Sequence, residues 1–329
     1  MHRMNKKIVV VFTFVMVALF AQSAFAQLGL NWEGQTGALL TPFAYTVGAP
    51  DNKLGKPEIA FHFLAGGPAL GEQFTLSATE GFGKRFEAGF TTTFAVQGSN
   101  SNGAWVGLGG ASPDAPGSLF SSSYTTLHGK YTLVKENAYK TKWIPAIAVG
   151  AVGRFGDSRV IGAVLPGVTS QAAGIGTTNG DFYLVATKLV PVKKVIFLLS
   201  AGEKVTNASL WGLAGNAGNV GYNSTNAPLA QSYHGNWFAT AGVAFTGPAK
   251  SLLVLGAEGV QQPHYIEAVN NVIQDYNNVP TSFSYFVRVQ PKGKPFNIDA
   301  ALVKVGGGLS HELNIQATSR FGTGITYHF

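Results

Sequence analysis

The chain has 329 residues, 12% of them charged, with 23 Lys and Arg against 16 Asp and Glu, and it contains no cysteine. Without cysteine there can be no disulfide, zinc–thiolate site, Cys nucleophile or lipid anchor on a mature N-terminal cysteine. The charged fraction is about half of the ~25% typical of soluble domains. The modest net charge without a Lys/Arg run argues against nucleic acid as a partner.

Residues 1–26 have the pattern of a cleaved signal peptide. A basic start, 1–7, precedes an apolar stretch from Ile8 to Phe20, and Ala24-Phe25-Ala26 offers a cleavage site before Gln27. A membrane-anchor helix is the less favoured alternative, because spanning needs ~20 apolar residues. We therefore expect export through the inner membrane, and cleavage would remove three basic residues, leaving a net charge of 20 − 16 = +4.

Residues 27–56 are apolar but interrupted. Pro42, Pro50 and Gly55 break the stretch that contains Gly37-Ala38-Leu39-Leu40. Proline is confined to particular positions in sheets. The segment is predicted to be a plug or lid of the following barrel, with an ordinary first strand as an equally weighted alternative.

Residues 57–329 repeat an alternation of apolar and polar positions, which is the period of a β-strand. Clear alternation occurs at 57–65, 72–80, 85–96, 236–245, 283–290, 296–303 and 313–329, and weaker candidates lie at 122–135, 142–155, 180–190, 194–205 and 251–261. At 142–155 and 180–190 the sequence does not indicate which face points outward. No stretch beyond residue 26 is long and apolar enough for a spanning helix.

The connections alternate between short and long. Short turns are expected at 81–84, 136–141, 190–193, 247–250 and 291–295, and longer Gly/Asn/Ser-rich loops at 97–121, 156–179, 206–233 and 262–281, with 306–311 a short exception. Outer-membrane barrels have this pattern, with turns in the periplasm and loops outside. The sequence therefore predicts an all-β, antiparallel transmembrane β-barrel of about twelve strands over 57–329. Fourteen strands are possible if 27–56 contributes a pair.

The C-terminal stretch from Leu313 to Phe329 is predicted to be one long closing strand. Its apolar positions include Phe321, Ile325, Tyr327 and Phe329. A terminal strand that ends on an aromatic residue resembles the closing strand of bacterial outer-membrane barrels. We expect the barrel-assembly machinery to recognise this strand and outer-membrane lipid to surround it.

Four short motifs resemble those of the YjbH-like outer-membrane proteins. They begin at Thr36 (TGALLTPFA), Trp143 (WIPAIAVG), Tyr183 (YLVATK) and Leu199 (LSAG), in that family's order. The resemblance implies a barrel associated with exopolysaccharide production and export, with no catalytic residues. The chain departs from the family in lacking a lipoprotein cysteine and in being much shorter than its long members.

No constellation in the sequence predicts catalysis or a cofactor. Ser310-His311-Glu312 are adjacent, so on a strand they point to opposite faces and cannot form a local triad. Metal-ligand spacings and calcium loops are missing. Gly107-Leu108-Gly109-Gly110 lacks the lysine and the strand–turn–helix setting of a phosphate loop. We expect no enzyme, cofactor or metal.

Charged residues fall on the face opposite the apolar one and are predicted to line the lumen, since Arg or Lys facing lipid at mid-membrane costs ~2–4 kcal/mol. They are Glu58, His62, Arg85, Glu87, His128, Lys130, Glu258, Arg288, Asp299 and Arg320. Two arrangements remain open: a hydrated pathway with acidic and basic walls, or an interior locked by charge pairing. Small barrels fill with side chains, so small or no steady conductance is expected.

These features predict an integral outer-membrane barrel that acts as a porin-like channel or accessory for passage of polar solutes or polysaccharide. A structural or adhesive barrel that binds through loops 97–121 and 206–233 is one alternative, and an outer-membrane lipid hydrolase is a weaker one. The solute and the oligomeric state are not indicated by the sequence.

Overall fold

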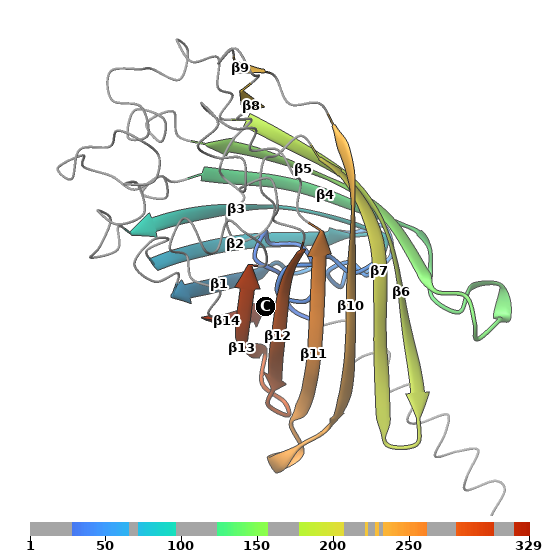
Figure 1. Ribbon diagram of the computed structural model, residues 1–329. Coiled ribbons are helices and arrows are strands. Elements are labelled where there is room, and N and C mark those ends of the chain that lie inside the picture. The colour runs from blue at the N-terminus through green and yellow to red at the C-terminus, as the bar shows by residue number, and fades with distance from the viewer. Residues whose placement is uncertain are drawn as a thin grey trace, which may run out of the picture.

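A computed structural model describes residues 28–65, 72–96, 124–156, 178–206, 221–222, 228–229, 233–261, 281–305 and 319–329. Twelve strands form one closed barrel in which every neighbouring pair is antiparallel (Figure 1). Strands adjacent in the sequence are adjacent in the wall, and β1 pairs with β14 to close it. The predicted twelve-stranded antiparallel barrel is confirmed. Among the described residues no helix is long and apolar enough to cross a membrane.

The wall strands are 8 to 15 residues long. They are β1 (Glu58–Ala65), β2 (Glu72–Phe82), β3 (Phe86–Val96), β4 (Tyr124–Val134), β5 (Ala146–Gly156), β6 (Thr178–Val192), β7 (Val195–Thr206), β10 (His234–Thr246), β11 (Leu252–Gln261), β12 (Thr281–Gln290), β13 (Phe296–Val305) and β14 (Arg320–His328). A separate two-stranded hairpin, β8 (Gly221–Tyr222) with β9 (Pro228–Leu229), lies within the predicted loop 206–233.

The strands present an apolar outer face and a mostly polar inner face. On β1, Phe61 is 45% exposed and its neighbour His62 is fully buried. Phe90 and Leu255, on β3 and β11, are also largely exposed. An apolar surface around a closed barrel is stable in lipid, because closure leaves no unpaired strand edge.

The two ends of the barrel differ in their connections. The end called here the turn end carries the short connections β2–β3, β4–β5, β6–β7, β10–β11 and β12–β13. Residue 57 and the C-terminus lie there too, with Phe329 N–H donating to Pro57 O at 3.4 Å. The opposite end, the loop end, carries the remaining connections, which are longer except for the one between β1 and β2.

Most predicted strand boundaries lie within two residues of the observed ones, and two differ by more. β5 begins at Ala146 rather than at 142, directly after Pro145, which has no N–H to donate to the ladder. The closing strand β14 begins at Arg320, and Ser319 lies outside it, so the predicted continuous strand from Leu313 is too long. Residues 313–318 lie outside the described part, as does the predicted signal peptide.

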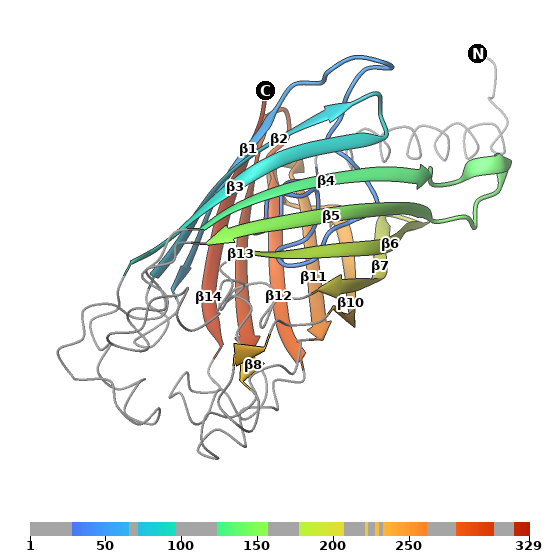
Figure 2. The same cartoon turned by 90° about the horizontal axis from the view of Figure 1, so that it is seen from above.

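The N-terminal segment, 28–56, runs through the barrel interior and contains no β-strand of its own (Figure 2). Residues 28–44 are all buried. The segment folds on itself, with Trp32 N–H donating to Leu39 O at 2.8 Å and Phe43 N–H to Thr36 O at 2.9 Å. It leaves at the turn end, where Gly55 N–H donates to Gly81 O at 2.8 Å. The predicted extra strand pair for a fourteen-stranded barrel is not formed.

Candidate functional site

The inner wall and the N-terminal segment meet in a set of buried polar contacts. Alternation along each strand turns every second side chain inward, so charged residues far apart in the sequence surround one segment. In a low-dielectric interior such groups must be paired or hydrogen-bonded. The contacts fall into four clusters, which are described in turn.

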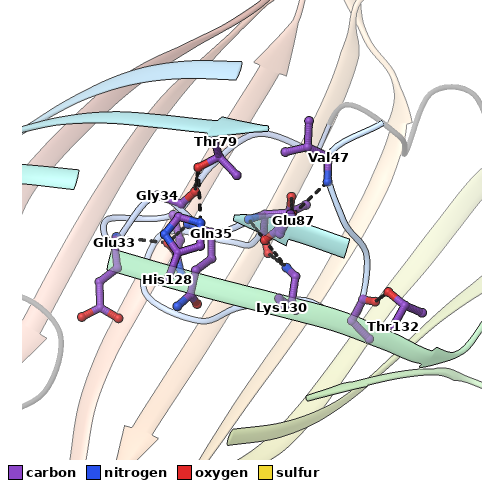
Figure 3. Close-up of polar contacts among 12 residues, drawn as sticks. Glu33, Gly34, Gln35, Val47, Thr79, Glu87, His128, Lys130 and Thr132 are labelled. Atoms are coloured by element: carbon purple, nitrogen blue, oxygen red, sulfur yellow. Dashed lines mark hydrogen bonds and ion pairs between the residues drawn. The ribbon is translucent and has the colours of Figure 1, made fainter. Parts of the chain in front are cut away.

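The first cluster centres on Glu87 of β3 and Lys130 of β4, which face each other across the sheet (Figure 3). Lys130 Nζ lies 2.8 Å from Glu87 Oε1, and both side chains are fully buried. Glu87 accepts hydrogen bonds from Thr36 N–H and Oγ1 and from Val47 N–H, at 3.1, 2.6 and 2.8 Å. Lys130 Nζ donates to Thr36 O at 3.0 Å. One ion pair of the wall thus binds both backbone N–H groups and a backbone carbonyl of the segment.

The second cluster is the pair Arg288 of β12 and Asp299 of β13, which are register partners. Arg288 donates from Nε to Asp299 Oδ1 at 2.6 Å and from Nη2 to Oδ2 at 2.9 Å, the bidentate geometry of a strong Arg–carboxylate pair. Its remaining nitrogen, Nη1, donates to Gly37 O at 2.8 Å. The guanidinium therefore joins the wall to the segment.

Glu258 of β11 forms the third cluster without any cation. Its carboxylate accepts from the backbone N–H groups of Leu39, Leu40 and Thr41 at 2.8–3.1 Å and from Thr41 Oγ1 at 2.9 Å. Successive N–H groups that converge on one anion form a nest. The hydroxyls of Thr41 and Thr240 are also hydrogen-bonded to each other. The turn 39–41 is shaped to receive this one side chain.

The fourth cluster is a quartet of charges from four parts of the chain. Arg154 of β5, Asp181 of β6 and Lys204 of β7 surround Glu33 of the segment, and all four are buried. Lys204 Nζ lies 2.7 Å from Asp181 Oδ2, and Arg154 donates from Nε to Glu33 Oε1 at 2.6 Å. Two acids and two bases balance one another only while Glu33 is present. Without it the wall would hold two cations against one carboxylate.

Apolar packing accompanies these contacts. Trp32, Leu39 and Phe43 of the segment belong to one buried hydrophobic cluster with inward wall side chains, including Leu198 and Phe238. The lumen therefore has an apolar core that the wall does not complete by itself.

The segment has a further anchor near the turn end, at Tyr45. Its hydroxyl donates to Glu136 Oε2 at 2.8 Å, and Lys188 Nζ lies 2.9 Å from Glu136 Oε1. Burial, and then the negative charge of Glu136, raise the pKa of Tyr45 well above its usual 10.0. The phenol therefore remains a donor throughout the physiological range.

Five of the ten positions that the sequence assigned to the lumen belong to these clusters, namely Glu87, Lys130, Arg288, Asp299 and Glu258. Glu58 is buried, with its Oε1 2.9 Å from His328 Nδ1. His62 is fully buried and its Nε2 donates to Leu30 O at 3.1 Å. The Glu58–His328 contact joins β1 to β14, and the His62–Leu30 contact joins β1 to the N-terminal segment.

The remaining three predicted positions are His128, Arg85 and Arg320. His128 is buried beside Thr79, whose hydroxyl donates to Gly34 O at 2.5 Å (Figure 3). Arg85 lies in the turn before β3, where Nη1 donates to Leu133 O at 3.0 Å. Arg320 is half-buried at the start of β14.

Sequence reasoning missed Glu33, Arg154, Asp181 and Lys204. Arg154 lies in 142–155 and Asp181 in 180–190, the two stretches for which the sequence does not indicate the outward face. On β5, small residues occupy both faces. Arg154 and Asp181 each lie close to the loop-end terminus of their strand, and this shared position was a usable signal in the sequence.

No group of three or more potential metal ligands occurs among the described residues. His62, His128 and His328 each contact different partners. The Ser310-His311-Glu312 sequence and the glycine stretch at 107–110 lie outside the part of the chain that the structure describes.

A closed antiparallel barrel with an apolar outer band and buried inner charges defines an outer-membrane-type β-barrel. Among solved structures the chain is similar to the KdgM porin in complex with disordered oligogalacturonate, with a TM-score of 0.43, 11% identity, and 83% of this chain and 99% of that chain covered. It is also similar to the NanC porin, with a TM-score of 0.44, 9% identity, and 83% of this chain and 98% of that chain covered. For LpxR from Salmonella typhimurium the TM-score is 0.46 and the identity 8%, with 83% of this chain and 100% of that chain covered.

No protein-family profile and no curated protein matches the sequence. The resemblance to YjbH-like proteins therefore stays a prediction.

Proposed function

We propose that this protein is an outer-membrane channel for polar solutes whose lumen is closed by its own N-terminal segment. The observation that carries the proposal is the burial of all residues 28–44 inside the barrel. A chain segment fixed there by four polar clusters and an apolar core occupies the space through which a solute would move. The segment thus has the position and the contacts of a plug.

The chemistry of the wall supports a channel beneath the plug. The inner face carries both signs of charge, and in the closed state these charges bind the segment or one another. When the segment leaves, the same groups become a hydrated wall of donors, acceptors and ions. Such a wall suits polar solutes, and the resemblance to YjbH-like proteins favours polysaccharide among them.

The path of the segment also supports a direction for its displacement. The segment leaves the lumen at the turn end, next to β1 and the C-terminus. Turns of outer-membrane barrels face the periplasm. Displacement would therefore begin from the periplasmic side, where a partner or a solute meets the segment first.

Conductance in planar bilayers tests the proposal. The full mature chain should show small or no steady current, and a chain lacking 28–49 should show large, long-lived currents. Both proteins must display heat-modifiable gel mobility, so that a folded barrel is being compared. Large steady currents from the full chain, or none from the folded deletion, would contradict the proposal.

If the deletion does not fold, a full-length variant replaces it. Glu258→Gln combined with Glu33→Gln weakens two clusters and leaves the apolar core intact. Brief openings should then become more frequent than in the unmodified protein. Loss of surface polysaccharide on gene deletion would separate an export role from a general porin.

A further inference from the structure

Basic side chains are concentrated on one rim of the barrel. Every connection at the turn end carries at least one Lys or Arg, as does the end of the N-terminal segment. The members of this basic rim are Lys53, Lys56, Lys84, Arg85, Lys135, Lys140, Lys142, Lys193, Lys194, Lys250, Lys292 and Lys294. The lysines are exposed, and among the described residues Lys84 is the rim lysine with a carboxylate partner, Asp51 at 2.8 Å.

The other end of the chain's strands has the opposite composition. In the sequence, the connections between strands at the loop end contain five acidic residues and one arginine. They are Asp114, Asp157, Glu267, Asp275 and Glu312, with Arg159. Solubility alone would not require basic residues at one end of the barrel and acidic residues at the other. The basic rim therefore reflects something that the turn end contacts.

The rim cations directly follow the lipid-facing apolar band. Phe82 and Phe86, 45% and 40% exposed, flank the Lys84-Arg85 turn, and the exposed Leu133 lies two residues before Lys135. Long lysine side chains next to an apolar surface extend their charge toward the interface. The charges therefore lie at the level where hydrocarbon gives way to headgroups.

The β4–β5 connection adds aromatic side chains to this rim, and it projects beyond its neighbours in both views (Figures 1 and 2). Tyr139 and Trp143 are 85% and 83% exposed, and Lys140 and Lys142 lie beside them in the sequence. Tyr and Trp are enriched at membrane–water interfaces, where an apolar ring meets a polar tip. Aromatic rings next to cations match an anionic headgroup above an acyl chain.

We propose that the basic rim binds the headgroups of anionic phospholipids in the leaflet that meets the turn end. Clustered Lys and Arg at a membrane surface attract anionic lipid through charge complementarity. The barrel's own lipid band brings these headgroups to the rim. A soluble anionic polymer fits less well, because the barrel mouth beside the rim is occupied by the N-terminal segment. The proposal is independent of what passes through the lumen.

Native mass spectrometry of the purified barrel tests this lipid site. The protein in neutral detergent is titrated with phosphatidylglycerol or with phosphatidylcholine of the same acyl chains. Phosphatidylglycerol should bind at least about tenfold more tightly, as expected for several interfacial cations. A variant carrying Lys140→Gln, Lys142→Gln, Lys193→Gln and Lys194→Gln should lose most of that preference.

Lys304→Gln is the matched control, since Lys304 is exposed near the loop-end terminus of β13. It should keep the full preference, and both variants should retain heat-modifiable mobility. Equal binding of the two lipids, or a preference that survives in the four-lysine variant, would overturn the proposal. Rim-dependent binding of soluble alginate that displaces phosphatidylglycerol would also overturn it and would assign the rim to a polymer.

Discussion

The outer and inner faces of the barrel wall place different requirements on their side chains, although the same strands supply both. The outer face of β1 presents Ile59 and Phe61 to lipid, and any large apolar side chain would serve there. The inner face presents Glu58 and His62, each with a particular partner. Lipid is a uniform environment, whereas the N-terminal segment is a specific one. The outer face is therefore tolerant, and the inner face is complementary to one piece of chain.

Among changes on the inner face, removal of Arg154 should lower the stability of the barrel most. Arg154→Met would leave Asp181 and Glu33 buried with Lys204 as their remaining cation, and loss of one member of a buried ion pair costs ~3–5 kcal/mol. Denaturant unfolding of the barrel in lipid vesicles measures the loss. Arg154→Lys, which keeps the charge, should lose less. Unchanged stability of the Met variant would show that the quartet does not support the fold.

A charge on the outer face should have the next largest effect. Leu255→Arg places a guanidinium in the middle of the lipid-facing surface of β11, which costs ~2–4 kcal/mol. The same unfolding measurement applies, with Leu255→Phe as the tolerated control. If the Arg and Phe variants are equally stable, that surface does not face hydrocarbon.

A smaller effect is expected from Glu258→Gln, which keeps the shape of the side chain and removes its charge. Hydrogen bonds to charged groups contribute ~1.5–3 kcal/mol, and the carboxylate receives three backbone N–H groups of the segment. Proteolysis of the N-terminal segment in folded barrels should become faster. Glu72→Gln, which alters an exposed carboxylate, should leave that rate unchanged, and equal rates for both variants would argue against the nest as an anchor.

The smallest expected effect is the alkaline behaviour of Tyr45. Its pKa is raised in the folded protein, so its contribution is fully present below the unfolded value of about 10 and falls as pH rises above it. Tyr45→Phe should be ~0.5–1.5 kcal/mol less stable at neutral pH. The difference should shrink above pH ~10 by up to ~1.4 kcal/mol per pH unit. A constant difference up to pH 11 would contradict the raised pKa of Tyr45.

The contrast between the faces also explains what could be predicted from the sequence. Alternation in 85–96 or 283–290 predicts a strand and its lipid face, because hydrocarbon selects for a simple pattern. The twelve strands and their closure follow from counting such segments. The later starts of β5, after Pro145, and of β14, after Ser319, are not visible in the alternation alone.

The candidate site could be predicted only in part. Glu87, Lys130 and Glu258 stand out as charges opposite an apolar face, so their inward direction could be expected. Their partners are backbone groups of the segment, such as Thr36 N–H and Leu40 N–H, and backbone groups carry no sequence signal. The role of Glu33 depends on three strands converging, which requires the closed barrel.

The central claim is that the N-terminal segment closes the lumen, and a reversible covalent lock tests it most directly. The chain has no cysteine, and the hydrogen-bonded Thr41 and Thr240 hydroxyls mark a position where Thr41→Cys and Thr240→Cys can join the segment to β10. In planar bilayers the oxidised protein should carry no steady current under any applied voltage. Reduction should restore the rare openings of the unmodified protein, with single-cysteine variants as controls. Large steady currents through the oxidised, locked barrel would contradict the account.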